Sequence, residues 1–316
     1  MKTVIINEND AGQRLDKFLG KYFKNMPKSL IYKGIRKKRI KVNGKKSEIN
    51  YSLKSGDKLE LYINDEFFEV PDERVSFMKI TAPSLEIVYE DENIILMDKS
   101  PGVIVHEDEN EKVNTLLNHM KAYLYQKGEY NPDDENSFVP ALCNRIDRNT
   151  GGIVIGAKNA AALRVLNEKI KSREIKKFYL CLVCGKLNKK QDILKGYLVK
   201  NTSQNRVYIH NSPVPNGKTI LTKYRVIKEN RLTSLVEVEL LTGRTHQIRA
   251  HFASIGHPLA GDGKYGKNEV NKELGMKIQA LYSYKLRFDF SDENILSYLN
   301  GKSFEVESVP FADSRI

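Results

Sequence analysis

The sequence predicts an α+β protein with two domains. Its 316 residues, 40% of them apolar, exceed the size of one typical domain and can bury a substantial core. Apolar residues recur at helical spacing near the amino terminus and again after residue 159, whereas short alternating or continuous apolar runs, typical of strands, occupy much of the remaining chain. Runs of both kinds fit the α+β class.

The positive charge of the chain is concentrated in one segment. Between Arg14 and Lys46 there are thirteen Lys or Arg residues and one acid, Asp16, so this segment carries +12 and the remaining residues sum to zero. Clustered cations of this kind are the electrostatic footprint expected for binding a polyanion, above all a nucleic acid. A merely solvated surface fits less well, because acids that would balance the lysines are nearly absent.

The same segment has the pattern of a small folded module. Helical spacing predicts a first helix over residues 15–23, and Pro27 suits the first turn of a second helix that turns Leu30, Ile31 and Ile35 inward. A strand over residues 39–42 is predicted to end in the Asn43-Gly44 hairpin turn, and another begins after Gly56. Because the module needs its apolar residues for its own core, attachment to a membrane surface is disfavoured.

Three further segments complete the outline of the chain. Residues 64–78 are acidic, contain Pro71 and predict a linker, and the turn-rich residues 126–137 predict a mobile loop. No segment is long and uncharged enough to cross a membrane, and the amino terminus lacks the pattern of a secretory signal. We therefore expect a cytoplasmic protein.

The stretch 143–159 holds a carboxylate, Asp147, between Arg145 and Arg148. An Asp between arginines is usually half of a weak surface ion pair. Here, however, an apolar run precedes it, and Gly151-Gly152 opens a second apolar run. This pattern predicts a strand, a tight connection and a buried strand, and rigid loops of this kind commonly carry chemistry.

Elements downstream of this stretch are also predictable. Asn159 is expected to cap a helix, and residues 177–180 and 236–240 have strand patterns. Arg244 precedes a helical apolar face formed by Ile248, Phe252 and Ile255. An arginine beside a helix amino terminus makes a locally positive site for a carboxylate or phosphate.

The cysteines and histidines do not predict a metal site. Cys181 and Cys184 are three apart in a strand-like run and should face opposite sides, and Cys143 is the third cysteine of the chain. His246 and His251 share a helix face poorly, and no acid completes a ligand set with them. We therefore expect structural cysteines in a reducing compartment and no metal.

Several motifs resemble a known family. The stretches GQRLDKFL, PKSLIYKGIRKKRIKVNGKK and YSLKSGDKLEL follow an S4-type RNA-binding domain, and the resemblance covers residues from about 12 to 63. The stretches NRIDRNTGG, KFYL and LLTGRTHQIRAHFASIGHPLAGDGKYG resemble the catalytic motifs of the RluA-type RNA pseudouridine synthases, and most closely those of the RluC branch.

The resemblance implies an architecture and a reaction. It implies an S4 domain at residues 12–63, a linker at 64–78 and a pseudouridine synthase catalytic domain at 79–316, with a mixed, mainly antiparallel sheet flanked by helices. The implied reaction isomerises uridine in RNA from an N-glycosidic to a C-glycosidic linkage and needs no cofactor. Attack could occur at the ribose C1′ or at the uracil C6.

Residue roles follow from the same resemblance. Asp147 would be the nucleophile, Tyr179 would pack against the uracil ring, and Arg244 would be the cation that pairs with Asp147 and favours its ionised form. The implied RNA-binding residues are Arg145, Arg148, Thr150, His246, Gln247 and Arg249 in the catalytic domain and Lys28, Lys33, Arg36, Lys37 and Lys38 in the S4 module.

The chain departs from the usual family pattern at four positions. Asn144 stands for His, Asn149 for Asp, Gly151 for Ser and Tyr282 for His. The expected substrate is large-subunit (23S) ribosomal RNA, with transfer RNA as the alternative within the class. A non-catalytic RNA-binding or ribosome-assembly factor on the same scaffold is the alternative from another class. We expect a monomer without an obligatory protein partner.

Overall fold

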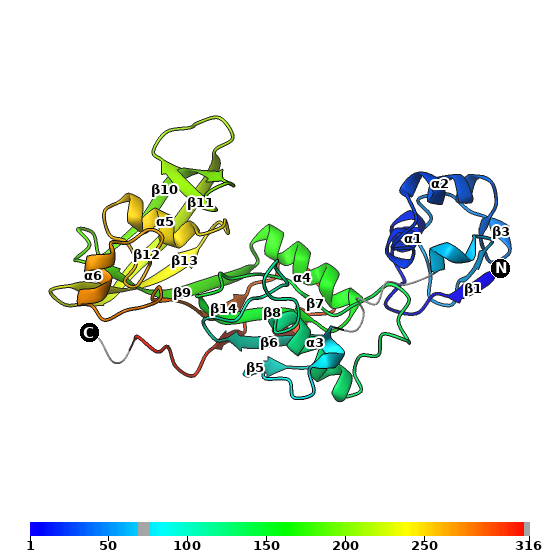
Figure 1. Ribbon diagram of the computed structural model, residues 1–316, viewed down its shortest axis with the longest axis horizontal. Coiled ribbons are helices and arrows are strands. Elements are labelled where there is room, and N and C mark those ends of the chain that lie inside the picture. Colours follow the sequence, from blue (N-terminus) through cyan, green and yellow to red (C-terminus); the bar gives the residue numbers. More distant parts are fainter. Residues whose placement is uncertain (69–75, 313–316) are drawn as a thin grey trace.

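The computed structural model describes residues 1–68 and 76–312, which form two separate sheets. Figure 1 shows an elongated molecule with a small amino-terminal module at one end and a large sheet with its helices in the rest. The predicted linker, 64–78, lies partly outside the described residues. Within them it holds the 3-10 helices η1 (Asp65–Phe68) and η3 (Phe77–Lys79). Phe67 and Phe68 of η1 pack against the core of the module.

The amino-terminal module combines two helices with a four-stranded antiparallel sheet in the order β1-β4-β2-β3. The turn at Asn43 and Gly44 has positive φ at both residues, as the predicted hairpin requires. The sheet of this module also includes a strand before residue 12, because β1 pairs with β4. Only Val4 of this short strand is buried, too little to give a recognisable pattern. The elements are β1 (Lys2–Ile5), α1 (Leu15–Tyr22), α2 (Lys28–Arg36), β2 (Ile40–Val42), β3 (Lys45–Lys46) and β4 (Lys58–Leu61).

In this module the apolar side chains are buried and the cationic side chains are exposed. Leu15, Phe18 and Leu19 of α1 are fully buried, and Ile31 and Ile35 of α2 pack into the same cluster. The cations predicted to contact RNA are all exposed: Lys28, Lys33, Arg36, Lys37 and Lys38. The second helix therefore presents a charged face to solvent.

The larger sheet is mixed and mainly antiparallel, which confirms the predicted α+β class. Its strand order is β11-β10-β12-β13-β9-β14-β8-β6-β5, with β15 on β14 and β7 on β8, and β14 and β8 run parallel. The strands are β5 (Ile87–Glu90), β6 (Ile94–Lys99), β7 (Ala141–Leu142), β8 (Gly151–Ala157), β9 (Ile175–Cys184), β10 (Gln191–Asn201), β11 (Arg206–His210), β12 (Lys218–Glu229), β13 (Thr233–Leu240), β14 (Leu281–Phe288) and β15 (Ser303–Glu305).

Strand β8 is covered on both faces. Its side chains alternate between two clusters: Ile153 and Ile155 pack with Leu166 of α4, whereas Val154 packs with Met120 of α3. The side chain of Asn159 accepts a hydrogen bond from Ala162 N and caps α4, as predicted. The helices of this part are α3 (Leu116–Gln126), α4 (Ala160–Ser172), α5 (Gln247–Ser254), α6 (Asn268–Glu273) and the 3-10 helix η4 (Ser297–Leu299).

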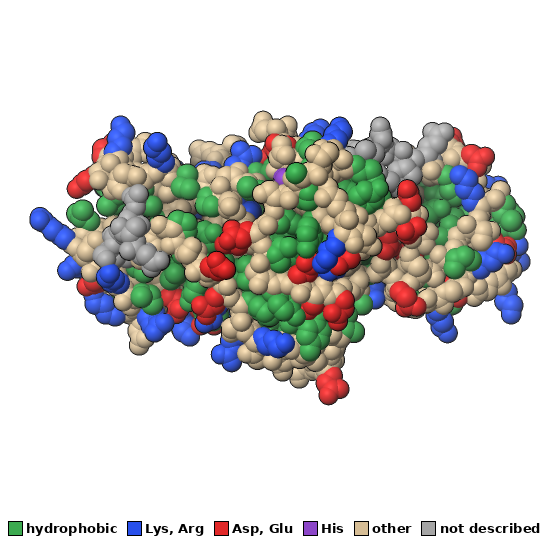
Figure 2. All heavy atoms as spheres, turned by 90° about the horizontal axis from the view of Figure 1, so that it is seen from below, with side chains coloured by type: hydrophobic (Ala, Val, Ile, Leu, Met, Phe, Trp, Pro, Cys, Tyr) green, Lys and Arg blue, Asp and Glu red, His purple; other side chains and the backbone are tan. Residues whose placement is uncertain are grey.

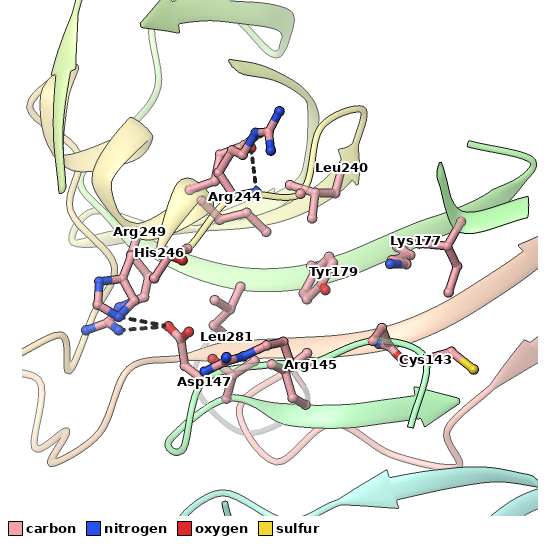
Figure 3. A pocket seen from close by; sticks show the side chains of 18 residues that line it. Cys143, Arg145, Asp147, Lys177, Tyr179, Leu240, Arg244, His246, Arg249 and Leu281 are labelled. Atoms are coloured by element: carbon pink, nitrogen blue, oxygen red, sulfur yellow. Dashed lines mark hydrogen bonds and ion pairs between the residues drawn. The ribbon is translucent and has the colours of Figure 1, made fainter. Parts of the chain in front are cut away.

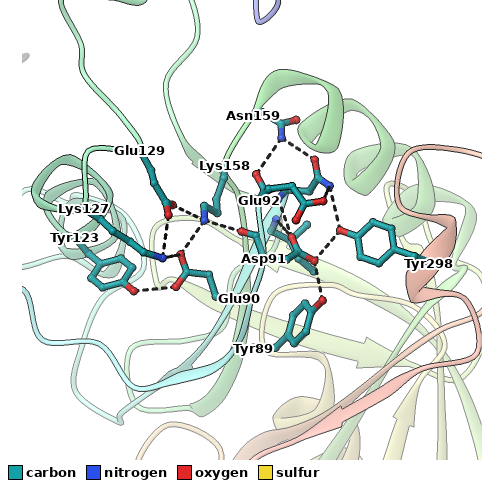
Figure 4. A network of polar contacts seen from close by, with 12 residues as sticks. Tyr89, Glu90, Asp91, Glu92, Tyr123, Lys127, Glu129, Lys158, Asn159 and Tyr298 are labelled. Atoms are coloured by element: carbon teal, nitrogen blue, oxygen red, sulfur yellow. Dashed lines mark hydrogen bonds and ion pairs between the residues drawn. The ribbon is translucent and has the colours of Figure 1, made fainter.

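A polar network joins β5 to α3, to the end of β8 and to the carboxyl-terminal segment (Figure 4). Glu90 of β5 accepts hydrogen bonds from Tyr123, Lys127 and Lys158, which joins α3 and the end of β8 to the edge strand. Asp91 accepts hydrogen bonds from the hydroxyl groups of Tyr89 and Tyr298, and the second of these links the carboxyl-terminal segment to the network. The network closes the end of the sheet that lies away from the carboxylate loop.

The two modules touch through the segment that was predicted to be a mobile loop. Asp10, which is fully buried, accepts hydrogen bonds from the side chains of Asn136 and Ser137. Asn9 accepts from Ala160 N at the start of α4. Residues 134–137 are therefore held by the amino-terminal module.

Charged side chains are distributed unevenly over the surface. On the face shown in Figure 2, Asp and Glu side chains gather toward the middle, and Lys and Arg side chains are more numerous toward the ends. Within residues 1–68 and 76–312, no helix is both long and apolar enough to cross a bilayer.

Candidate active site

The Asp147 loop is fixed at several points between β7 and β8. The backbone oxygen of Arg148 accepts from Gly102 N at 2.8 Å and from the Lys99 ammonium at 2.9 Å. At the end of the loop, Thr150 is buried and its hydroxyl accepts from Gln279 Nε2 at 3.0 Å. Asp147 thus stands on a loop tied to the sheet, as its flanking runs predicted.

Lys99 is a structural residue at the end of β6. Its side chain is almost completely buried and donates three hydrogen bonds to the backbone oxygens of Ser100, Val103 and Arg148. Burial lowers the pKa of Lys99 to about 8, although the charges of Asp147 and Asp98 oppose that shift. The ammonium group therefore joins the turn after β6 to the Asp147 loop.

The cation that pairs with Asp147 is Arg249, and the prediction of Arg244 was wrong. Arg249 Nη1 lies 2.8 Å from Asp147 Oδ2, while its other nitrogens bind the fully buried Asp262 at 2.7 and 2.9 Å. Arg244 is exposed, and Figure 3 shows it pointing away from Asp147. Its backbone N–H donates to Gln247 Oε1.

The start of α5 explains this outcome. The helix begins at Gln247, after His246 in the left-handed conformation with φ of 53°. Arg244 therefore precedes the helix, whereas Arg249 lies within its first turn and is held by Asp262. The expectation that Ile255 belongs to the buried face also failed, because it follows the last helical residue and is 40% exposed.

His246 completes the surroundings of the carboxylate. Its Nε2 lies 3.8 Å from Asp147 Oδ2, and its Nδ1 is 2.9 Å from the Tyr265 hydroxyl. Burial lowers the pKa of His246, an effect that the Asp147 charge opposes and the Arg249 charge reinforces. His246 is therefore neutral at pH 7, which leaves Arg249 as the charged partner.

Asp147 faces a cavity of about 320 Å³. Tyr179 of β9, Leu240 of β13 and Leu281 of β14 form its apolar part (Figure 3). Burial and the negative charge of Asp147 raise the pKa of Tyr179 to about 12, so its hydroxyl stays protonated at neutral pH. A planar ligand in this cavity would contact the aromatic ring of Tyr179 and the carboxylate of Asp147.

The residues predicted to bind RNA differ in whether their side chains already have protein partners. Arg145, Thr150, His246, Gln247 and Arg249 line the cavity, and Arg148 is exposed and paired with Asp108 at 2.8 Å. Arg249 is bound to Asp147 and Asp262, the side chain of Gln247 to Leu221, Thr222 and Thr242, and that of Thr150 to Gln279. Gln247 and Thr150 are therefore better explained as supports of the site.

One departure from the family pattern has a local explanation. Asn144 Oδ1 accepts from Ile155 N at 2.8 Å, one residue after Cys143 N has donated to Ile155 O. The amide side chain thus continues the β7–β8 hydrogen bonds where the backbone turns away. Asn144 fixes the start of the Asp147 loop to the buried strand β8.

Two other departures compensate each other. A Cβ atom at Gly151 would lie 2.2 Å from Tyr282 Cε2, so the tyrosine ring fills the space that a side chain at 151 would need. The Tyr282 hydroxyl donates to both oxygens of the buried Asp98, at 2.8 and 3.0 Å. At Gly152, φ is +113° and a Cβ atom would lie 2.3 Å from Ser283 O. The glycine pair therefore allows β8 to approach β14.

Among the described residues, no cluster of three or more potential metal ligands occurs. The cysteines are free: Cys181 is buried in the core cluster with Tyr179, whereas Cys184 packs with the cluster around Leu182 on the other face. His251 is within 2.9 Å of the Thr222 hydroxyl, and His257 within 2.9 Å of Cys184 O. These side chains serve the packing of the sheet and α5.

Comparison with known proteins agrees with these features. Residues 93–254 match the RNA pseudouridylate synthase family, and residues 13–59 match the S4 domain. The solved structure of human RNA pseudouridylate synthase domain containing 1 has the same fold, with a TM-score of 0.55 and 24% identity over 67% of this chain and 82% of that chain. Fold and site thus define an enzyme in which a catalytic α+β domain follows an RNA-binding module.

The relatives are similar over most of their length. Ribosomal large subunit pseudouridine synthase C from Vibrio parahaemolyticus is 32% identical over 90% of this chain and 87% of its own, and its Escherichia coli K12 counterpart is 32% identical over 91% and 88%. An RNA pseudouridine synthase from Mycoplasma capricolum is 34% identical over 96% of both chains. The chain belongs to the RNA pseudouridine synthase family, whose members are isomerases.

The Gly151–Tyr282 contact predicts a specific coupling. Gly151→Ala should lower the free energy of unfolding by about 1–3 kcal/mol, because the new Cβ collides with a packed ring. In a Tyr282→Ala background the same change should cost at least about 1 kcal/mol less. Chemical denaturation of the four proteins of this cycle measures the coupling, and Tyr282→Phe is the control that keeps the ring. Equal costs in both backgrounds would contradict the compensation.

Asp98 predicts a pH dependence of stability. Burial raises the pKa of Asp98 from 3.8 to about 6, an effect that the Tyr282 hydrogen bond opposes. The folded state therefore binds more protons than the unfolded state in this window, so stability should fall as the pH rises from about 4 to about 6.

Asp98→Asn should remove this part of the decline, by about 1–3 kcal/mol, because the amide keeps an acceptor for Tyr282 but does not ionise. Denaturant titrations at a series of pH values compare the two proteins. Parallel pH profiles for wild type and variant would show that Asp98 has no such effect.

Proposed function

We propose that this chain isomerises specific uridines of large-subunit ribosomal RNA to pseudouridine, with Asp147 as the nucleophile. The relatives named Ribosomal large subunit pseudouridine synthase C support the substrate, since they match about nine-tenths of this chain. The observation that carries the catalytic assignment is the contact of Asp147 with the buried Arg249 beside Tyr179 at the cavity.

The proposed chemistry breaks the bond from ribose C1′ to uracil N1 and forms one from C1′ to C5; C5 loses its proton and N1 gains one, so the product is an isomer of the substrate. Asp147 attacks the nucleoside as a carboxylate, at C1′ or at C6, and detachment of the base allows it to rotate. Arg249 favours the charged form of Asp147 and restricts its orientation, because Asp262 fixes the guanidinium.

The cavity walls suit a detached uracil. Tyr179 supplies a neutral aromatic side chain against which the base can pack while it turns. The target uridine has to leave its stack to reach Asp147. Arg145, which lines the cavity, would contact a phosphate or fill the space that the extruded base leaves in the RNA.

The division into modules belongs to the same proposal. The exposed cations of α2 and of the residues that follow it would bind RNA through phosphates, independent of sequence, and bring it to the catalytic domain. We further propose that the protein acts as a monomer in the cytoplasm.

Replacing the nucleophile tests the proposal. Asp147→Asn should lower the rate of tritium release from uridine-labelled ribosomal RNA by at least about 1000-fold, because the amide cannot attack, and should change RNA affinity by less than about twofold. Mapping pseudouridines in ribosomal RNA with and without the protein identifies the sites. Retained turnover in Asp147→Asn, or an unchanged pseudouridine map in the deletion strain, would refute the proposal.

Replacing Arg249 and replacing Arg244 should have different effects on stability. Arg249→Gln leaves Asp262 buried without a cation, so it should lower the free energy of unfolding by about 3–5 kcal/mol and remove most activity. Arg244→Gln, at an exposed position, should change stability by less than about 0.5 kcal/mol and leave the Asp147 contact intact. Denaturation and tritium release on both variants decide between them. Greater loss of stability in Arg244→Gln would reverse the assignment.

A further inference from the structure

A second hollow, of about 690 Å³, adjoins the catalytic cavity. Three segments line it: the Asp147 loop at Asn149, strand β11 at Arg206 and Tyr208, and the chain between residues 261 and 279. Arg249 lines both hollows. An RNA strand that delivers a base to Asp147 would therefore place a neighbouring nucleotide at the second hollow.

This hollow is strongly cationic. Arg206, Lys264 and Lys277 line it together with Arg249, and no carboxylate is among the described residues of its lining. The nearby Asp262 is fully buried and accepts hydrogen bonds from Arg249 and from the backbone N–H groups of Lys264 and Tyr265. The charge of Asp262 is thus matched inside the protein, which leaves the lysines to attract an anion.

The position of Asn149 is informative in this setting. The family pattern usually has Asp here, and this chain has a neutral, half-buried amide that lines the hollow. A carboxylate at 149 would lie among cations and compete with an anionic ligand for them. The substitution therefore makes the hollow a better site for a phosphate.

An aromatic side chain stands beside these cations. Tyr208 is 45% exposed, and the Arg206 guanidinium lies 6.0 Å from its ring centre and 5.1 Å from that of Tyr265. The Tyr265 hydroxyl accepts from Val207 N at 3.0 Å, which fixes β11 to the 261–279 segment. An exposed ring next to cations is the combination that binds a base and its phosphate in single-stranded RNA.

We propose that this hollow binds the phosphodiester of a nucleotide next to the target uridine, with Tyr208 against the base of that nucleotide, and that the neutral side chain of Asn149 raises the affinity. The inference rests on the proposed function, because it assumes an RNA strand that enters the neighbouring cavity. It assigns to this chain a second RNA subsite built by β11, the Asp147 loop and the 261–279 segment.

Two variants test the subsite from opposite walls. Lys277→Gln removes a cation at an exposed position, and Asn149→Asp adds a carboxylate at a half-buried one. Each should raise KM for an unmodified large-subunit ribosomal RNA transcript by about fivefold and change kcat by less than about twofold. In filter binding, Lys277→Gln should also reduce the slope of log affinity against log salt by about 0.7.

Matched controls carry the same charge changes elsewhere. Lys302→Gln and Asn188→Asp alter exposed residues outside both hollows and should leave KM and the salt slope unchanged. Tyr208→Ala should raise KM, and Tyr208→Phe should restore it, because the ring makes the contact.

Several results would overturn the subsite. It fails if Lys277→Gln and Asn149→Asp behave like their controls, or if they weaken inhibition by uridine monophosphate but leave KM for RNA unchanged, which would indicate a site for free nucleotides. Salt slopes from RNA binding do not need turnover. If the wild type forms no pseudouridine, the proposed function fails, while the binding slopes still decide whether this hollow contacts an RNA phosphate.

Discussion

The site depends on one buried guanidinium. Arg249 binds Asp262 through two of its nitrogens and Asp147 through the third, so a single side chain connects α5, the segment after it and the Asp147 loop. A buried cation between two carboxylates is stable only when each group is hydrogen-bonded, and Asp262 satisfies this by also accepting two backbone N–H groups. The orientation of Asp147 is thus set by residues more than a hundred positions away in the sequence.

A rigid loop is the second constraint, and here the chain reaches it by its own combination of residues. Asn144 extends the β7–β8 hydrogen bonds, Lys99 holds the Arg148 backbone, and Tyr282 fills the space beside Gly151. The departures at 144, 151 and 282 therefore do not loosen the loop. Each of these three residues has a partner on a neighbouring strand, and the pair at 151 and 282 shows that two departures can be one structural change.

Local patterns predicted what local physics determines. The Asn43-Gly44 hairpin, the Asn159 cap and the buried strand after Gly152 all follow from conformational preferences within a few residues. The choice between Arg244 and Arg249 does not, because it depends on where α5 begins and on the packing of Asp262 against it. Likewise, the hydrogen bond from Lys99 to the backbone oxygen of Arg148 joins segments that are 49 positions apart in the chain, and no spacing in the sequence reveals it.

The charges of the two domains are arranged differently, which bears on how each would act on a polyanion. Residues 14–46 carry a net charge of +12, so the strongest long-range attraction for a polyanion arises in the amino-terminal module. The catalytic domain, residues 79–316, carries a net charge of +6, from 35 Lys or Arg and 29 Asp or Glu, and its cations attract an anion where acids are locally absent or already matched. Arg206, Lys264 and Lys277 around the second hollow meet that condition, because no carboxylate is among the described residues that line it. Under the proposed function, contacts with the amino-terminal module would favour any RNA at low salt, whereas contacts with the catalytic domain would favour a strand whose shape brings one base to Asp147.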